Sequence, residues 1–429
     1  MIETFEKTCK NNAQKTAFIS KGRRVTFQRL LSDVYKMANM LQHNGLHVGS
    51  KALLFALPGY KFYVLLFACV YCGVNVFVLD AYKKPAKIVE VMEQNGIDTV
   101  FCDNRTGLLK GIFPQNAKFL NINCFAKHSN IAPKSVTDES CTVITTFTSG
   151  TTGQPKPIGR SILALKEQIQ SISQNVDIAN SSVVLVALPI YVLFVVYGGA
   201  SCLLSKSIDK NLVERYNVDT VIAPISMLLK TKGVCCNVKN TYCGGARLYK
   251  RQVEDLERIF PCAHRWYVYG ATECALIGKT NLKNYLETYA IQKLANGLNL
   301  SFVDVDKLGI GKICVSGNAV LTREKRFVSG DLGLLDENGL HIVGRAKYST
   351  TGVYNYLLDD EILEQNPMVK RGFSFVFEGK IFFCYEGKAM QTREGVQFVS
   401  VRKLPMDAKH KTKLDYHKMV EILQKRKLI

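Results

Sequence analysis

The segment Thr145–Lys156, TTFTSGTTGQPK, constrains this chain more than any other feature of its sequence. Glycine, threonine and serine fill most of the segment, so it offers many free backbone N–H groups and hydroxyls with little side-chain bulk. Such a segment can close around phosphate oxygens, and Lys156 adds a positive charge at its end. A surface loop rich in Ser, Thr and Gly would have a similar composition, so other features must decide between the two interpretations.

The sequence around this segment alternates between helical and strand patterns. Apolar residues recur at helical spacing in Phe27–Leu41. Runs typical of strands lie at Lys51–Leu57, Val74–Leu79, Val100–Cys102, Phe119–Ile122 and Cys141–Phe147. The alternation predicts an α/β fold with parallel-rich sheets flanked by helices. We expect strand Cys141–Phe147, then the glycine-rich loop, then a helix over about Ser161–Asn175, because a loop that binds phosphate usually leads into a helix.

Two apolar runs, Phe62–Leu79 and Val183–Leu204, have the length of a membrane span. Glycine and asparagine interrupt the first run, and proline and glycine interrupt the second. We therefore favour buried helix-plus-strand units of an α/β core over spanning helices.

The pattern changes near Arg345. The segment Lys347–Asn355 is polar and contains a glycine, which is typical of a linker. Beyond it the sequence predicts a small α+β unit. Its elements are a helix at Asp359–Gln365, a hairpin of Ser374–Phe377 with Ile381–Tyr385, and a helix at Tyr416–Gln424. We expect a large N-terminal domain, residues 1–346, and a small mobile C-terminal domain, residues 347–429.

Lys and Arg number 56 against 36 Asp and Glu, so the formal net charge is +20. A charge of this size favours anionic partners, although a solvated basic face would also account for it. The sequence has no helix-turn-helix, zinc-finger or aromatic-basic RNA-binding signature, so we do not expect nucleic acid to be a partner. The 14 cysteines are scattered and the N-terminus lacks the apolar stretch of a signal peptide, so we expect a cytoplasmic protein with reduced thiols.

Three further motifs follow the glycine-rich segment in order: YVYGATE at Tyr267–Glu273, SGDLGLLDENGLHIVGR at Ser329–Arg345 and LPMDAKHKTKLDY at Leu404–Tyr416. Taken singly, each has a purely structural interpretation. The second motif would be a β-hairpin with ordinary charges, and the third a solvated basic loop before a helix. It is the combination of these motifs, in this order, that argues for a shared function.

Together with CGGARL at Cys243–Leu248, these motifs resemble those of the AMP-forming adenylate superfamily, which includes acyl-CoA synthetases, adenylation domains and luciferases. Phe147–Lys156 is similar to the family's [YF]TSGTTGxPK motif, and YGATE is similar to its YGxTE motif. The resemblance extends over nearly the whole chain. It implies ATP and Mg²⁺ as cofactors and a C-terminal domain that swings about a hinge near Lys347.

The resemblance also implies roles for the matching residues. Adenine would lie against Tyr269 and the close-approach glycine Gly270, with Gly245 and Ala246 on its other side. The pyrophosphate part of ATP would be enclosed by Thr148, Ser149, Gly150, Thr151, Thr152, Gly153 and Lys156.

The remaining implied roles concern the ribose, the metal and the acyl group. Asp331 would accept hydrogen bonds from both ribose hydroxyls, and Arg345 would support the ribose or the α-phosphate. Glu273 would help to hold Mg²⁺, with Thr272 as a neighbouring catalytic hydroxyl and Ala271 beside the acyl group.

The family's usual catalytic motif ends in SGK, which this chain lacks. Residues Pro405–Asp415 instead resemble the PxDxRHxxKID variant of some bacterial members, including enzymes that form β-lactones. On this alignment Lys413 is the catalytic lysine, and Lys411 is the weaker candidate.

The segment Val183–Val196 is apolar and has no charged selector, so we expect a fatty or hydroxy-fatty acid as substrate. Tyr191 and Phe194 would line or gate an acyl tunnel, or both would belong to the core. The expected acceptor is a phosphopantetheine thiol on CoA or on an acidic acyl carrier protein. The alternatives are a β-lactone synthetase that cyclises a β-hydroxy acid and a non-catalytic nucleotide-binding relative.

Overall fold

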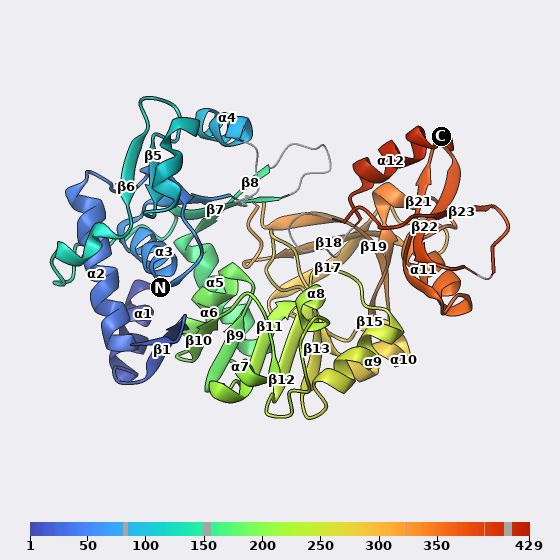
Figure 1. The fold of residues 1–429 in the computed structure, drawn as a ribbon, viewed down its shortest axis with the longest axis horizontal. Coiled ribbons are helices and arrows are strands. Elements are labelled where there is room, and N and C mark those ends of the chain that lie inside the picture. The colour runs from blue at the N-terminus through green and yellow to red at the C-terminus, as the bar shows by residue number, and fades with distance from the viewer. Residues whose placement is uncertain (80–84, 149–155, 323, 390, 407–413) are drawn as a thin grey trace. The chain divides into compact units, whose positions relative to one another are not determined.

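The computed structural model describes residues 1–79, 85–148, 156–322, 324–389, 391–406 and 414–429 (Figure 1). The chain forms two compact units. The first consists of Met1–Ala223 with the short segments Cys235–Thr241 and Thr272–Ala275. The second consists of Pro224–Val234, Tyr242–Ala271 and Leu276–Ile429. The domain boundary predicted at residue 347 lies inside the second unit and stays a prediction.

One sheet of the first unit has the strand order β6-β5-β3-β4-β7-β8. Its strands are β3 (Lys51–Phe55), β4 (Asn75–Val78), β5 (Thr99–Cys102), β6 (Lys118–Asn121), β7 (Thr142–Thr148) and β8 (Lys156–Ser161). All neighbours from β6 to β7 pair in parallel, whereas β8 pairs antiparallel with β7. The sheet confirms the predicted parallel-rich α/β class.

A second group of strands in this unit has the order β11-β9-β10-β1-β2. These strands are β1 (Thr16–Ser20), β2 (Arg23–Thr26), β9 (Val183–Val186), β10 (Ser201–Leu204) and β11 (Thr220–Pro224). The helices of the first unit are α1 (Ile2–Asn11), α2 (Phe27–His43), α3 (Tyr60–Cys72), α4 (Pro85–Asn95), α5 (Ile162–Asn175), α6 (Pro189–Tyr197), α7 (Lys210–Arg215), and the 3-10 helices η1 (Thr106–Ile112) and η2 (Cys124–Lys127).

The two apolar runs form buried helix-plus-strand units, as predicted. The first run folds into α3 and β4, and the second into β9, α6 and β10. Every residue of α3 from Phe62 to Cys72 is buried, and so is every residue of α6 from Tyr191 to Tyr197. None of the helices in the described ranges is long and apolar enough to cross a membrane.

The expected order of strand, glycine-rich loop and helix is wrong in one respect. Strand β8 lies between the loop and helix α5, so β7 and β8 form an antiparallel pair in which Thr148 stands opposite Lys156. Pro157 is tolerated because β8 is an edge strand of its sheet. Helix α5 starts after Ser161, whose hydroxyl caps it by accepting the Ala164 N–H. The helix N-terminus is therefore separated from the loop by a whole strand.

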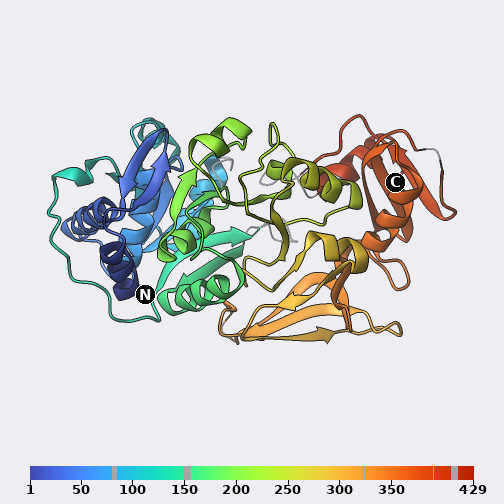
Figure 2. The ribbon, with the colours of Figure 1, turned by 90° about the horizontal axis from the view of Figure 1, so that it is seen from below.

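Apart from Asn240 and Thr241 at the start of β12, two further groups of strands belong to the second unit before its C-terminal part. Strands β12 (Asn240–Gly244), β13 (His264–Tyr269), β14 (Gly278–Asn281) and β16 (Lys293–Leu294) are neighbours in the order β16-β14-β13-β12. A five-stranded sheet has the order β15-β20-β19-β18-β17, with β15 (Ala290–Ile291), β17 (Leu298–Val303), β18 (Gly311–Gly317), β19 (Arg326–Asp336) and β20 (Gly339–Arg345). Strands β17 to β20 are the light orange and orange arrows in Figure 2. The helices beside these strands are α8 (Ile225–Leu228), α9 (Lys250–Ile259) and α10 (Leu282–Thr288), and the 3-10 helix η3 (Ala346–Tyr348) follows β20.

The C-terminal part of this unit is the predicted α+β structure. Its strands are β21 (Val369–Phe377), β22 (Lys380–Gly387) and β23 (Val396–Ser400), and its helices are α11 (Asn355–Gln365) and α12 (Tyr416–Lys425). Side chains alternate across β22, so Phe382 packs with α12 residues such as Met419 while Phe383 packs with α11 residues such as Leu358. The two helices thus cover opposite faces of one small sheet.

Candidate active site

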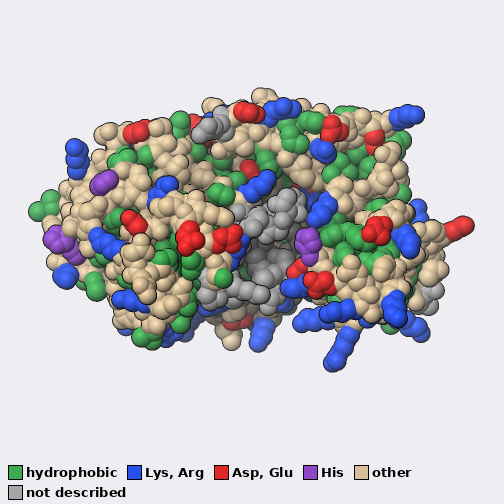
Figure 3. Space-filling view, turned by 90° about the horizontal axis from the view of Figure 1, so that it is seen from above, with side chains coloured by type: hydrophobic (Ala, Val, Ile, Leu, Met, Phe, Trp, Pro, Cys, Tyr) green, Lys and Arg blue, Asp and Glu red, His purple; other side chains and the backbone are tan. Residues whose placement is uncertain are grey.

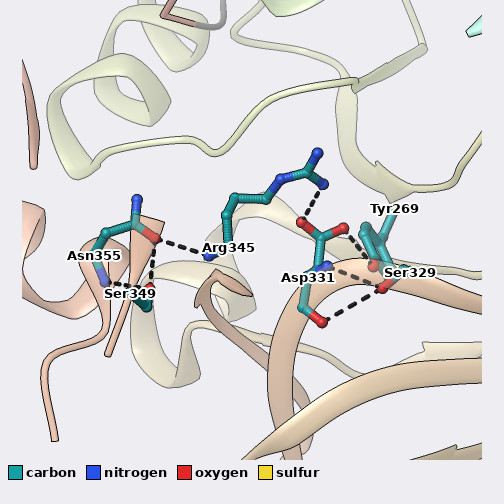
Figure 4. Close-up of polar contacts among 6 residues, drawn as sticks. All are labelled: Tyr269, Ser329, Asp331, Arg345, Ser349 and Asn355. Atoms are coloured by element: carbon teal, nitrogen blue, oxygen red, sulfur yellow. Dashed lines mark hydrogen bonds and ion pairs between the residues drawn. The ribbon is translucent and has the colours of Figure 1, made fainter. Parts of the chain in front are cut away.

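Asp331 and Arg345 of the third motif form an ion pair because the hairpin places them opposite each other. Asp331 of β19 is the register partner of Arg345 of β20. Arg345 Nη1 donates to Asp331 Oδ1 over 2.7 Å, and Tyr269 Oη donates to Asp331 Oδ2 over 2.9 Å (Figure 4). Ser329 Oγ accepts the Asp331 N–H over 3.1 Å. The Asp331 carboxylate is therefore fixed in position by a cation and a phenol.

The electrostatics of this trio favour a neutral tyrosine and a charged arginine. Burial and then the negative charge of Asp331 raise the pKa of Tyr269 well above its ordinary value. Burial alone would lower the pKa of Arg345, but the attraction and hydrogen bond of Asp331, together with the nearby Tyr356 and Tyr269, raise that pKa. Tyr269 thus remains a hydrogen-bond donor, and Asp331 keeps acceptor capacity because its carboxylate has further lone pairs and its side chain is 15% exposed.

The predicted linker after Arg345 is held by the first residue of α11. Asn355 Oδ1 accepts the backbone N–H of Arg345 over 2.8 Å and the Ser349 hydroxyl over 3.0 Å (Figure 4). The Asn355 N–H donates to Ser349 Oγ over 3.1 Å. Lys347 Nζ lies 5.2 Å from the centre of the Tyr416 ring. These bonds connect the end of β20 to the start of α11.

The predicted adenine-lining residues lie at the ends of two neighbouring strands, β12 and β13. A Cβ at Gly244 would lie 2.3 Å from the Val268 carbonyl oxygen, so only glycine fits the close approach of these strands. Gly245 has φ +86 and open space around it, and Ala246 O accepts from Tyr267 Oη over 3.1 Å. Gly270 is exposed and Ala271 is half-buried.

Arg247, the residue after Ala246, has charged and aromatic partners that the motifs did not predict. Its side chain is 8% exposed and forms an ion pair with Asp360 of α11. Its guanidinium also lies 5.2 Å from the centre of the Tyr356 ring. No local sequence signal pointed to this role, because the partners are more than 100 residues away in the chain.

Two adjacent carboxyl groups of α11 have altered acidity next to Arg247. Burial raises the pKa of Asp359 to about 8, opposed by hydrogen bonds from Ser374 and by the charge of Arg247. Burial also raises the pKa of Asp360 to about 6, opposed by Arg247. Asp359 is fully buried, whereas the Asp360 side chain is 26% exposed.

The raised pKa of Asp359 predicts that the second unit loses stability as pH rises. Between the ordinary carboxyl pKa and about 8, the unfolded chain is ionised while the folded chain keeps the proton. Asp359 by itself should lower the free energy of unfolding by at most about 1.4 kcal/mol per pH unit in this window, and its contribution should level off above it. Urea unfolding at pH 5 to 9, followed by the fluorescence of the single tryptophan, Trp266 in β13, measures this. Asp359→Asn keeps an acceptor for the Ser374 N–H and should show a flatter profile; an identical profile would contradict the assignment.

Thr272 and Glu273 belong to the first unit, where a buried arginine binds the Thr272 carbonyl oxygen and is attracted by the charge of Glu273. Arg160 of β8 donates from Nη2 to the Thr272 carbonyl oxygen over 3.0 Å and from Nη1 to Thr146 Oγ1 over 2.7 Å. Arg160 is only 4% exposed. Burial lowers the pKa of Arg160 to about 10, and the attraction of Glu273 opposes this shift. Arg160 therefore remains charged at neutral pH.

Tyr191 and Phe194 lie on α6 in the same unit. Tyr191 Oη donates to the Ala275 carbonyl oxygen over 3.4 Å, two residues beyond Glu273. Its ring meets that of Phe194 edge to face, with centroids 5.4 Å apart. Phe194 is 2% exposed and lies in the interior of the unit. Of the two residues, Tyr191 is thus the one that contacts the chain just beyond the YGATE segment.

Several predicted site residues lie outside the described residues, namely Ser149, Gly150, Thr151, Thr152, Gly153, Lys411 and Lys413. Thr148 ends β7, and Lys156, which is exposed, begins β8. Their assigned roles stay predictions.

A Mg²⁺ ion that binds with a nucleotide needs few protein ligands. Within the described ranges no group of three or more His, Cys, Asp or Glu could hold a metal. Mg²⁺ at nucleotide sites usually takes one or two carboxylates and completes its shell with phosphate oxygens and water. The half-buried carboxylate of Glu273 fits that donor set.

A protein-family model described as AMP-binding enzyme matches residues 5–323 of the chain. The protein belongs to this family. The match confirms the resemblance drawn from the motifs, since it includes every motif except the two that follow residue 323.

Three solved structures show the same fold at low sequence identity. o-Succinylbenzoate CoA synthetase (MenE) from Bacillus subtilis, in complex with an acyl-adenylate, has a TM-score of 0.83 at 18% identity, covering 97% of each chain. ATP-bound MatB from Rhodopseudomonas palustris has a TM-score of 0.83 at 17% identity, covering 98% of this chain and 99% of that one. A Mycobacterium tuberculosis fatty acyl CoA synthetase has a TM-score of 0.78 at 12% identity, covering 98% and 97%. These similarities confirm the predicted fold class.

Among curated proteins, the chain is 22% identical over 174 residues to a polyketide synthase–nonribosomal peptide synthetase, ffsA, from Aspergillus flavipes. The match covers 41% of this chain and 4% of that much longer protein.

Proposed function

We propose that this AMP-binding family member activates a carboxylic acid with ATP and Mg²⁺ to form an acyl-adenylate and pyrophosphate. The observation that carries the proposal is the group formed by Asp331, Arg345 and Tyr269. A carboxylate held by a cation and a phenol is a preorganised acceptor for a pair of hydroxyls, as the ribose of ATP presents. The ATP-bound and acyl-adenylate-bound structures of similar fold support the nucleotide assignment.

In the proposed reaction a carboxylate oxygen of the acid attacks the α-phosphorus of ATP. The bond between the α-phosphorus and the bridging oxygen breaks, and pyrophosphate leaves with the electron pair. Asp331 and Tyr269 hold the nucleoside, and Glu273 is the ligand for Mg²⁺, which spreads the charge of the phosphates when bound. Lys413 supplies the cation between the two repelling anions, the carboxylate and the triphosphate.

The proposed substrate is a fatty or hydroxy-fatty acid, and the proposed acceptor is a phosphopantetheine thiol on CoA or on a carrier protein. The apolar α6, which contacts the chain two residues beyond the YGATE segment through Tyr191, supports an apolar acyl group. Two of the similar structures are named CoA synthetases, which supports a thiol acceptor. Lys and Arg side chains occur at many places on the face in Figure 3, with Asp and Glu between them, and a net charge of +20 would favour an acidic carrier.

A β-lactone synthetase remains the second candidate. The Pro405–Asp415 motif and the sequence LPIYVLF, which starts at Leu188, both resemble those of β-lactone-forming members. Product analysis with a β-hydroxy acid, in the presence and absence of CoA, distinguishes the two: a thioester requires the thiol, whereas a β-lactone forms without it.

Substrate-dependent exchange of pyrophosphate into ATP, over a panel of fatty, β-hydroxy, aryl and amino acids, tests the proposal. Asp331→Asn should raise the KM for ATP by about tenfold, because it removes a charge-assisted acceptor of the ribose hydroxyls. Asp336→Asn is the matched control, since Asp336 sits on the same β19–β20 hairpin but binds His341 near its turn. ATP binding without exchange for any acid would instead support a non-catalytic nucleotide-binding protein.

A further inference from the structure

Arg160 is a buried charged side chain of the first unit whose partners the proposed mechanism does not explain. It lies on β8, diagonally across from Thr146 on β7, because Ile158 pairs with Thr146 and Arg160 pairs with Ile144. Its two terminal nitrogens bind a hydroxyl and a backbone carbonyl, both uncharged. Within the described residues, Nε has no hydrogen-bond partner.

A buried guanidinium with only neutral hydrogen-bond partners keeps its charge without a neutralising contact. Burying an ion costs several kcal/mol unless other charges compensate. Along the described chain no carboxylate lies within 4 Å of Arg160 in an ion pair, and the carboxylate whose attraction it feels is that of Glu273. Glu273 directly follows Thr272, whose carbonyl oxygen Arg160 binds. The positive charge is thus held at the backbone of Thr272, the residue directly before the one assigned to the metal.

We propose that Arg160 is a positioning residue for Glu273, which it orients toward Mg²⁺ by joining Thr146 and the Thr272 carbonyl through one rigid guanidinium. This inference rests on the proposed function of Glu273 as the metal ligand. The planar guanidinium presents two N–H groups at a fixed angle, so it links β7, two residues before Thr148, to the segment that carries Glu273. Lysine at this position has one flexible ammonium and cannot reproduce that two-point geometry.

The proposal predicts a specific loss in metal-dependent binding. The readout is the ratio of ATP affinity in Mg²⁺ to ATP affinity in EDTA, measured by calorimetry on the full-length protein without any acid. Arg160→Lys keeps the positive charge and should reduce this ratio about tenfold, while affinity in EDTA changes less than twofold. Thr146→Val removes only the hydroxyl acceptor and should reduce the ratio about threefold. If Arg160→Lys does not fold, this second variant still tests the proposal.

A matched control is Arg265→Lys, because Arg265 also donates to a backbone carbonyl, that of Phe260, over 2.7 Å. This control should leave the ratio within twofold of the parent value. A ratio that Arg160→Lys leaves unchanged, or an equal loss in Arg265→Lys, would overturn the inference and make Arg160 a purely structural anchor. Pyrophosphate exchange by the unaltered protein is measured separately, so a failure of the proposed function would be visible in that assay alone.

Discussion

Replacing Arg247 by methionine is expected to lower the free energy of unfolding of the second unit by about 3–4 kcal/mol. The substitution keeps an apolar stem but leaves Asp360 without its cation. Removing one partner of a buried ion pair typically costs about 3–5 kcal/mol. We expect the lower part of this range because Asp360 remains 26% exposed to water.

Urea unfolding monitored by Trp266 fluorescence measures this loss, since Trp266 lies in the same unit. Arg258→Met is the matched control, because Arg258 pairs with Asp255 on α9 but is 75% exposed. An exposed pair contributes only about 0–1 kcal/mol, so the control should change little. Equal losses in the two variants would show that the Arg247–Asp360 pair is no more important than a surface ion pair.

Replacing Lys413 by alanine is expected to slow acyl-adenylate formation by about 10²–10³ in kcat, with little change in the KM for ATP. The proposed lysine charge acts where the attacking carboxylate meets the triphosphate, and removing one preorganised charge from such a position typically has an effect of this size. Pyrophosphate exchange with the best acid of the panel measures the loss.

The neighbouring lysine provides the control for this experiment. Lys411→Ala removes an equal charge two residues earlier and should change the exchange rate by less than about threefold. A larger loss in Lys411→Ala than in Lys413→Ala would move the catalytic role to Lys411 and would shift the alignment of the C-terminal motif by two residues.

Local sequence patterns predicted much of the fold correctly wherever interactions between residues close in the sequence determine the structure. The hairpin at Ser329–Arg345 forms because alternating strands flank a turn, where Gly339 adopts φ +124 next to the Ile291 backbone, a position that excludes a Cβ. That register alone brings Asp331 opposite Arg345. The two apolar runs fold into buried units because Gly73 ends α3 and Gly198 ends α6, which begins only at Pro189, so neither helix reaches membrane length.

Other structural features could not be predicted from local sequence patterns, because contacts between distant parts of the chain create them. Lys156–Ser161 contains proline and glycine, so its sequence does not indicate a strand. It becomes β8 because β7 offers a free edge to pair with. The corrected order, strand, loop, strand and then helix, also means that the glycine-rich loop does not share the N-terminus of α5.

The sequence by itself determined the family, the parallel-rich α/β class and the identity of the nucleotide-binding motifs, because these depend on short segments whose residue types are tied to one conformation or chemistry. Only the tertiary structure decided the partners of the two buried arginines. Arg160 meets the Thr272 carbonyl 112 residues away, and Arg247 meets Asp360 113 residues away. A buried charge is tolerated only where folding brings acceptors around it, and that requirement leaves no periodic or local trace in a sequence.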